Sequence, residues 1–383
     1  MKNNNVLKSS GDSFFIKGRG IPKGCEFCLK GAKTVLFLNG ICQLPDHCSW
    51  YCPISKKRKG KNQSYANEHE ISSNKELLEE IRTTNSKGMS ITGGEPLSKY
   101  NLNKTIEFIR YIKSELGAPF HIHLYTNALN FSDTVAQSLD KVGLDEIRFH
   151  PPRDKWKIMK FALDTNMSVG AEVPVIPQKE YLSSLKEFIL YLDSIGAEFI
   201  NLNEFEYCFP NSETLKERGF TLKKGTIASV ENSKESAMNL IKNVLSYTSL
   251  KIHFCRIITK DYFQLKNRYL RRAKNVKKPY EEITEEGLLL YAEITGNLEN
   301  LLKFNRYLIK IAQVPLEFVH MDKEILIIPY YIALEEEVGF LLKKYNLKTF
   351  IIETTPFQDP KYRQITEKTP LKIFKEEYEF YES

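Results

Sequence analysis

Short apolar runs alternate with longer amphipathic segments along most of the chain. The apolar runs, which we expect to be strands, cover residues 34–38, 89–92, 120–126, 146–150, 168–176, 199–203 and 251–255. The segments between them have apolar side chains at helical spacing and cover residues 74–83, 102–115, 132–142, 155–166, 181–195 and 234–246. Strand and helix in regular alternation predict a parallel sheet covered by helices. Six or seven such units fit an α/β fold, a partial (β/α)6-7 TIM-like barrel with functional groups at the carboxyl ends of its strands.

The pattern changes after residue 280. Strands are expected at residues 288–294, 316–320, 324–328 and 348–354, and helices at residues 298–311 and 334–345. The resulting βαββαβ order is that of a ferredoxin-like domain, a motif that does not by itself fix a function. We therefore expect four parts: an N-terminal segment (1–32), the barrel (33–260), a basic connector helix (261–280) and a ferredoxin-like C-terminal domain (281–383).

Three cysteines follow the first predicted strand. Cys42, Cys48 and Cys52 are separated by five and then three residues, and Tyr51 precedes the last of them. Three thiolates can hold three irons of a [4Fe–4S] cluster and leave the fourth iron open to a ligand such as S-adenosylmethionine (SAM). A zinc site uses similar loops and is the main alternative.

A glycine-rich turn, residues 93–96, follows the second predicted strand. Gly93 and Gly94 allow the backbone to approach a ligand closely, and Glu95 can face an ammonium group. Pro96 ends the motif.

Together these motifs resemble the radical SAM enzymes, and most closely a mostly archaeal group related to the pyruvate formate-lyase activating enzymes. The resemblance covers roughly residues 20–270 and includes residues 30–33 before the first strand and 125–127 at the end of the third. The cysteine spacing departs from the family's three and two residues. The resemblance implies a [4Fe–4S] cluster and SAM as cofactors, a 5′-deoxyadenosyl radical that abstracts hydrogen from a substrate, and ferredoxin or flavodoxin as electron donor.

Polar residues at the strand ends are the further candidates for the site. The resemblance implies a SAM-binding set that comprises Tyr51, Gly93, Gly94, Glu95, Pro96, Asn127, Glu172 and Asn203. For the substrate we expect His150 and one polar helical face after the last barrel strand, made of Asp261, Gln264, Arg268 and Arg272.

A second metal site is a separate possibility. Cys25 and Cys28 have the Cys-x-x-Cys spacing of metal ligands, and His253 and Cys255 lie on the same side of the last barrel strand. If the first and last strands border the opening of the barrel, these four groups converge. They could then hold zinc, iron or a second iron–sulfur cluster. A redox pair at Cys25 and Cys28 is the alternative.

Composition and charge limit the remaining classes of function. The chain has 383 residues, 42% of them apolar, which suits a globular protein with a substantial core. No apolar run approaches the ~18 residues of a membrane span, and the polar start predicts a cytoplasmic protein without a membrane partner. Seven cysteines without an export signal suit metal ligands or reduced thiols.

The net charge of +7 is concentrated in two basic stretches. One covers residues 56–61, just after the cysteine loop, and the other residues 262–280. Such stretches can bind polyanions, so the substrate could be a protein, as for an activase, or a tRNA. A non-enzymatic zinc or iron–sulfur protein that binds nucleic acid is the alternative from another class. The glycine-rich turn disfavours it, because a structural metal needs no such turn.

Overall fold

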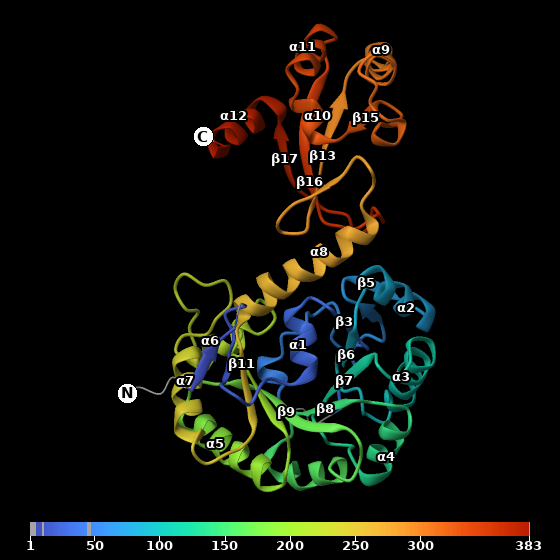
Figure 1. Ribbon diagram of the computed structural model, residues 1–383. Coiled ribbons are helices and arrows are strands. Elements are labelled where there is room, and N and C mark those ends of the chain that lie inside the picture. Colours follow the sequence, from blue (N-terminus) through green and yellow to red (C-terminus); the bar gives the residue numbers. More distant parts are fainter. Residues whose placement is uncertain (1–4, 10, 44–46, 383) are drawn as a thin grey trace. The chain divides into compact units, whose positions relative to one another are not determined.

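The structure is a computed structural model that describes residues 5–9, 11–43 and 47–382 (Figure 1). The chain divides into two compact units. The first comprises Met1–Arg82 with Ser86–Leu265, and the second comprises Thr83–Asn85 with Lys266–Ser383.

Seven parallel strands form the centre of the first unit. They are β3 (Lys33–Phe37), β6 (Gly88–Thr92), β7 (His121–Thr126), β8 (Glu146–Phe149), β9 (Ser168–Val175), β10 (Phe199–Glu204) and β11 (Lys251–Cys255). Antiparallel strands extend both ends of this sheet: β1 (Val6–Lys8) and β2 (Phe14–Ile16) beside β11, and β4 (Ser64–Ala66) and β5 (His69–Ile71) beside β3. The expected α/β class with a large parallel sheet is therefore confirmed.

Helices connect the parallel strands. They are α2 (Asn74–Thr83), α3 (Leu102–Leu116), α4 (Asp133–Lys141), α5 (Lys179–Ser194), α6 (Ser212–Glu217) and α7 (Ser233–Val244). In Figure 1 most of them lie outside the strands, whereas α1 (Lys23–Leu29) lies on the inner side and contacts β3, β6 and β7.

The expected α-helix at residues 155–166 is instead a 3₁₀ helix, Arg153–Ala162. Its apolar residues Trp156, Met159 and Ala162 recur every third position, which suits three residues per turn better than 3.6.

The two faces of the parallel sheet differ in polarity. One row of paired residues, fully or almost fully buried, is apolar and faces the helices: Leu36, Ile91, Leu124, Ile147 and Val169. The neighbouring row, one residue earlier, contains Ser90, His123 and Glu146. Parallel sheets are usually apolar on both faces. The polar inner face therefore marks the place where this unit carries chemistry.

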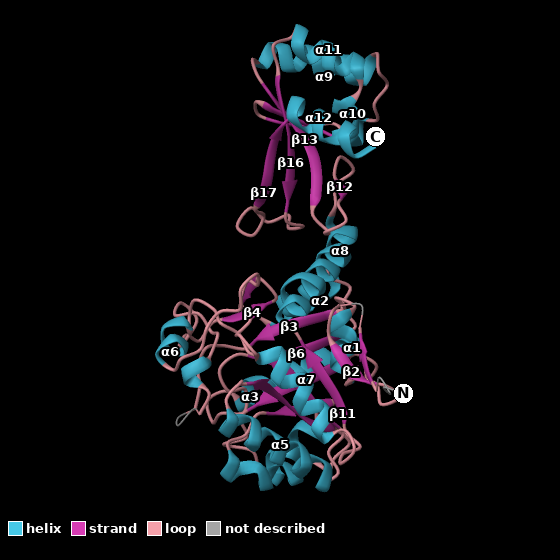
Figure 2. Cartoon of the chain, turned by 90° about the vertical axis from the view of Figure 1, so that its left-hand side faces the viewer, coloured by secondary structure: helices cyan, strands magenta, loops and turns pink. Residues whose placement is uncertain are grey.

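The second unit contains an antiparallel sheet with the order β14 (His320–Asp322), β15 (Ile325–Ile328), β13 (Leu289–Thr295), β16 (Lys348–Thr354) and β17 (Ile365–Pro370). The short strand β12 (Glu282–Ile283) pairs with β13. The helices are α8 (Leu265–Val276), α9 (Leu298–Lys310), α10 (Tyr330–Leu334), α11 (Glu336–Lys344) and α12 (Leu371–Glu382). Figure 2 shows β13, β16 and β17 side by side, and Phe304, Leu326 and Ile351 belong to the core that covers this sheet.

One predicted strand of this unit begins later than expected. Residues Leu316–Phe318 form a 3₁₀ turn, and the strand starts only at His320. Pro315 precedes the turn, and its fixed φ favours a turn over the start of a strand.

Candidate active site

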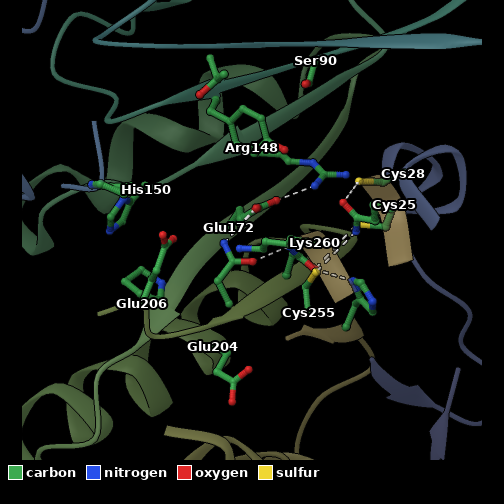
Figure 3. Close-up of a pocket in the computed structure, with 18 of the residues that line it drawn as sticks. Cys25, Cys28, Ser90, Arg148, His150, Glu172, Glu204, Glu206, Cys255 and Lys260 are labelled. Atoms are coloured by element: carbon green, nitrogen blue, oxygen red, sulfur yellow. Dashed lines mark hydrogen bonds and ion pairs between the residues drawn. The ribbon is translucent and has the colours of Figure 1, made fainter. Parts of the chain in front are cut away.

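The polar inner face of the parallel sheet lines a cavity of about 440 Å³ (Figure 3). Every one of the seven parallel strands contributes at least one side chain: Lys33, Ser90, Tyr125, Arg148, Glu172, Asn201 and Cys255 are examples. Helix α1 adds Cys25 and Cys28, and the segment after β11 adds Lys260 and Gln264.

The three cysteines of the first motif lie on the loop at the carboxyl end of β3. Cys42, Cys48 and Cys52 are all partly buried, and residues 44–46 between them lie outside the described residues. A short 3₁₀ turn, Ser49–Tyr51, separates the last two cysteines.

The glycine-rich turn packs directly against the start of this loop. The amide of Glu95 donates to the carbonyl of Ile41 at 3.0 Å, and the amide of Gly94 donates to the carbonyl of Asn39 at 2.7 Å. A Cβ on Gly94 would lie 2.1 Å from the Ile41 oxygen. Gly93 has a φ of 131°, a conformation that glycine alone adopts readily. Both glycines are thus needed to hold the turn beside Cys42.

The carboxylate of Glu95 is engaged by groups of the protein itself, and its expected contact with an ammonium group stays a prediction. It is 2% exposed and accepts three hydrogen bonds, from the Leu97 amide at 2.9 Å, the Asn127 amide at 2.7 Å and the Thr126 hydroxyl at 2.8 Å. Burial raises its pKa to about 7 against the lowering effect of these bonds. The Glu95 carboxylate therefore fixes the turn to the end of β7.

Asn127 and Pro96 complete this frame. The Asn127 side chain accepts a hydrogen bond from the Leu129 amide at 3.0 Å, and the Pro96 carbonyl accepts one from the Thr105 hydroxyl at 2.8 Å. Both residues are buried parts of the frame around the turn.

Tyr51 connects the cysteine loop to the cavity. Its hydroxyl lies 2.9 Å from His150 Nε2, and its carbonyl accepts a hydrogen bond from Asn211. Burial raises the pKa of Tyr51, and the neighbouring Cys48 and Cys52 raise it further. Burial lowers the pKa of His150 to about 3, so its imidazole is neutral near pH 7.

A buried ion-pair network crosses the cavity. Arg148, which is 2% exposed, donates through Nε to Glu146 at 2.6 Å and through Nη1 to Glu172 at 2.5 Å. The other oxygen of Glu172 accepts from Asn203 Nδ2 at 2.9 Å. Burial alone would raise the pKa of both carboxyls, but Arg148 holds the pKa of Glu146 at about 2 and that of Glu172 below its usual value.

The four residues of the second predicted metal site all line this cavity. Cys28 Sγ lies 2.7 Å from Gln264 Oε1, and Gln264 Nε2 lies 3.8 Å from Cys255 Sγ. Cys25 Sγ and His253 Nδ1 both contact Asn201 Oδ1, at 3.7 and 2.5 Å. Two amide side chains thus lie between the four groups. Burial raises the pKa of Cys25 and of Cys255, the latter to about 12, which keeps both as thiols.

These contacts bear on both sets of candidate metal ligands. Within the described ranges, no three His, Cys, Asp or Glu side chains are gathered so that they could hold one metal ion. Neither set is gathered around one point in this structure, and a second metal at Cys25, Cys28, His253 and Cys255 stays a prediction. The thiols of a [4Fe–4S] cluster each bind a different iron, so Cys42, Cys48 and Cys52 need not surround one point. Their donor set, at one strand end beside a glycine turn, fits such a cluster.

Of the four residues predicted to form a substrate-binding helical face after β11, only one lines the cavity. Residues Thr259–Gln264 form a π-helix, so the α-helical spacing assumed from sequence does not apply there. Gln264 lines the cavity, whereas Asp261 is exposed and lies outside it. Arg272 is buried in the second unit, where its Nε donates to the Pro356 carbonyl at 2.9 Å. Arg268 also belongs to the second unit. A substrate contact of Arg268 or Arg272 stays a prediction.

Several polar residues on the inner face of the sheet were not predicted from sequence. Arg148, His123 and Tyr125 occupy inward positions of β7 and β8, where polar residues recur at every second position inside buried strands. That alternation was the available signal. Lys33 lies in the motif at residues 30–33, for which no binding role was predicted. No role was predicted for Lys260 either.

Comparison with known proteins adds two observations at the sequence level. The family described as "4Fe-4S single cluster domain" matches residues 30–142. A curated protein of Methanocaldococcus jannaschii, named "Putative glycyl-radical enzyme activating enzyme", is 37% identical over 352 residues, which are 88% of this chain and 90% of that protein.

Solved structures show weaker likeness. A radical S-adenosylmethionine methyltransferase from Kitasatospora setae matches with 8% identity and a TM-score of 0.36, over 71% of this chain and 58% of that one. D-glucarate dehydratase from Agrobacterium tumefaciens matches with 11% identity and a TM-score of 0.28, over 56% and 54%. Neither similarity is large enough to carry an argument. In the part of the chain that is described, no helix is both long and apolar enough to cross a membrane.

Proposed function

Because the chain belongs to the radical S-adenosylmethionine superfamily, we propose that Cys42, Cys48 and Cys52 hold a [4Fe–4S] cluster and that SAM binds between this loop and the interior cavity. The protein is an enzyme of the radical SAM type. When bound, the reduced cluster supplies one electron that cleaves SAM to methionine and a 5′-deoxyadenosyl radical.

The contact between Ile41 and the glycine-rich turn is the observation that carries this proposal. It places the backbone of Gly93 and Gly94 beside the first cysteine, where an amino-acid group bound at an open iron needs backbone partners. Glu95, Thr126 and Asn127 hold the turn from behind. We thus assign SAM recognition at this end to the turn's backbone and its positioning to Glu95.

The other end of SAM would reach the inner face of β8, β9 and β10. Glu172 and Asn203 are joined there by a hydrogen bond, and His150 is a neutral imidazole bound to Tyr51. These groups can orient a ribose through hydrogen bonds without adding a proton to it. The buried rings of Phe205 and Phe220 stack around Trp50 and exclude water from the loop's base.

For the substrate we propose a protein, as in the activating enzyme whose name the Methanocaldococcus relative carries. The radical would abstract a hydrogen atom from a backbone or side-chain carbon of that protein. Ferredoxin or flavodoxin is the proposed electron donor. The likeness to an activase supports this choice; the cavity itself does not distinguish the substrate.

A tRNA substrate is the second candidate, and one surface feature favours it. Lys56, Lys57, Lys59 and Lys61 are exposed on a turn just after the cysteine loop. Two hydrogen bonds join this turn to Gly40, from the Gly60 amide and to the Lys61 carbonyl, both at 2.8 Å. The basic turn is therefore held close to the cluster loop, where a polyanion would bind near the reacting group.

We also propose that the first unit is a partial (β/α) barrel and the second a ferredoxin-like domain. The strand order from β3 to β11 supports the first assignment, and the order β14, β15, β13, β16 supports the second.

The test is SAM turnover by anaerobically reconstituted protein with dithionite. We expect 5′-deoxyadenosine and methionine in equal amounts. Protein that holds iron and sulfide but forms no 5′-deoxyadenosine would overturn the proposal. If tRNA is the substrate, added total tRNA should change the rate of SAM cleavage, and the Lys56→Glu, Lys57→Glu variant should lose this effect. If tRNA is not the substrate, the rate of SAM cleavage should stay the same.

A further inference from the structure

Two ammonium groups face the interior cavity without a partner. Lys33 is the first residue of β3, and Lys260 follows β11. These are the first and last of the seven parallel strands in the order of the sheet. Neither makes a hydrogen bond or ion pair through its side chain to any described residue. Both are partly buried. Two ammonium groups that make no hydrogen bond to a described residue leave their N–H donors available in the cavity, where an anion could accept from them.

Three of the nearby carboxylates are engaged by other groups, whereas Glu206 also lines the cavity and raises the pKa of Lys260. Both oxygens of Glu172 are occupied, by Arg148 and by Asn203, and Glu146 is held by Arg148 and by the Gly24 amide at 3.1 Å. Figure 3 shows the Glu204 carboxylate directed away from the thiols, where it accepts the Ile257 amide at 2.9 Å.

The two lysines line the same cavity. Against the lowering effect of burial, Cys28, Tyr125 and Glu172 raise the pKa of Lys33, and Cys255, Glu172, Glu206 and Cys28 raise that of Lys260. Both lysines therefore carry their charge. Figure 3 shows Cys25 and Cys28 on the side of the cavity opposite His150.

Lys33 lies apart from the proposed SAM groups on the cysteine loop, whereas Lys260 follows the carboxyl end of β11. Lys33 is the first residue of β3, and the loop begins beyond Phe37, the last. At about 3.3 Å per residue the two ends of this strand are about 13 Å apart. Helix α1, which carries Cys28, likewise packs near the amino ends of the strands, since Gly24 contacts Glu146 at the start of β8.

We propose that Lys33 and Lys260 form a binding site for the carboxylate or phosphate group of a small molecule in the cavity that Cys28 and Gln264 also line. The site goes beyond the proposed SAM cleavage, because it concerns a second ligand. The Gln264 amide, now 3.8 Å from the Cys255 sulfur, can turn its N–H toward such an anion. The thiols of Cys25 and Cys255 are neutral and so do not repel it.

Inorganic phosphate is the probe, with the full-length reconstituted protein at constant ionic strength kept by potassium chloride. Phosphate should raise the thermal unfolding midpoint with saturation. Lys33→Gln and Lys260→Gln should each weaken apparent phosphate affinity at least about tenfold, the scale of one charged hydrogen bond. The matched control is Lys216→Gln, an exposed lysine of α6 that should leave the response unchanged. An equal phosphate response in all four proteins would overturn the site.

A second measurement needs no variant. The carboxylate reagent iodoacetate should modify Cys28 faster than neutral iodoacetamide, as mapped by mass spectrometry, and phosphate should protect Cys28 from it. Faster reaction with iodoacetamide, without phosphate protection, would contradict the proposal.

The affinity for SAM shows whether the anionic group belongs to SAM or to a second ligand. Lys33→Gln should change SAM affinity less than about threefold. A loss as large as that for phosphate would place the methionyl carboxylate of SAM between the lysines, and no second ligand would then be needed. None of these readouts depends on SAM cleavage, so their failure and the failure of the radical chemistry can be told apart.

Discussion

Thr126 donates its hydroxyl to Glu95 at 2.8 Å, which ties the end of one parallel strand to the turn that follows its neighbour. With the amides of Leu97 and Asn127, three donors share this single buried carboxylate. In the proposed function, the acidic residue of the glycine-rich motif would act on SAM through the backbone that it positions.

Glu95→Ala should therefore destabilise the fold as well as weaken SAM binding. Three buried donors would lose their acceptor, and we expect a loss of about 2–4 kcal/mol in the free energy of unfolding, measured by urea denaturation. Glu217→Ala, at an exposed helical position, is the control and should change stability by less than about 0.5 kcal/mol. If Glu95→Ala loses SAM affinity with its stability intact, the carboxylate instead contacts the ligand directly.

Gly94→Ala tests the contact between the turn and the cysteine loop. The added methyl would overlap the Ile41 carbonyl and push the start of the loop away, so iron incorporated on reconstitution should fall by at least about half. Gly196→Ala is the control, because Gly196 has a positive φ but open space around its Cα. That variant should cost about 1 kcal/mol in stability and keep its iron. Normal iron content in Gly94→Ala would argue against the turn as support for the loop.

Arg148 should be the most sensitive single position in the cavity. Arg148→Met leaves Glu146 and Glu172 buried without their cation, and we expect a loss of about 3–5 kcal/mol in unfolding free energy. Combining it with Glu146→Gln and Glu172→Gln should restore part of that loss. No recovery in the triple variant would mean that Arg148 acts by packing.

Three buried histidines predict acid sensitivity. Burial lowers the pKa of His150 and of His253 to about 3, and that of His123 well below its usual value of 6.5. Below about pH 6.5 the unfolded chain binds protons that the folded chain does not, so stability falls as pH falls. Glu95 acts in the opposite direction, because its pKa is raised to about 7 in the folded chain. Above about pH 4.5 the folded chain therefore holds one proton on Glu95 that the unfolded chain has lost, and this cancels the effect of one histidine.

The net expectation is a loss of about 2.7 kcal/mol per pH unit between roughly pH 6 and 4.5, from two protons at 1.36 kcal/mol each. Urea denaturation across this interval measures it. In His253→Gln the free energy of unfolding should change less steeply with pH, by the equivalent of about one bound proton. A flat profile would show that these imidazoles are not neutral in the fold.

The sequence predicted the parallel strands well because each is a short apolar run between amphipathic helices. Leu36, Ile91 and Leu124 face the helices, and their pattern alone sufficed. The helix at Trp156 was assigned the wrong type, since apolar residues three apart fit both helix types over one or two turns. The edge strand Ile365–Pro370 was missed, because most of its residues are exposed and charged or polar residues interrupt its pattern.

The site was predicted where residues are neighbours in sequence and missed where the fold brings them together. Cys42, Gly94 and Glu95 stand in recognisable motifs. Arg148 and Lys33 are single charges whose importance depends on which way a strand faces. The convergence of Cys28 with Cys255 was expected, but Gln264 between them was not, because a contact between side chains more than 200 positions apart leaves no local pattern.

Iron and sulfide content after anaerobic reconstitution tests the central assignment most directly, when two triple variants are compared. Cys42→Ala, Cys48→Ala, Cys52→Ala should lose the [4Fe–4S] cluster and its absorbance completely. Cys25→Ala, Cys28→Ala, Cys255→Ala removes the same number of thiols from the cavity and should keep about four irons and four sulfides per chain. A cluster that survives the first change, or disappears only with the second, would contradict the account.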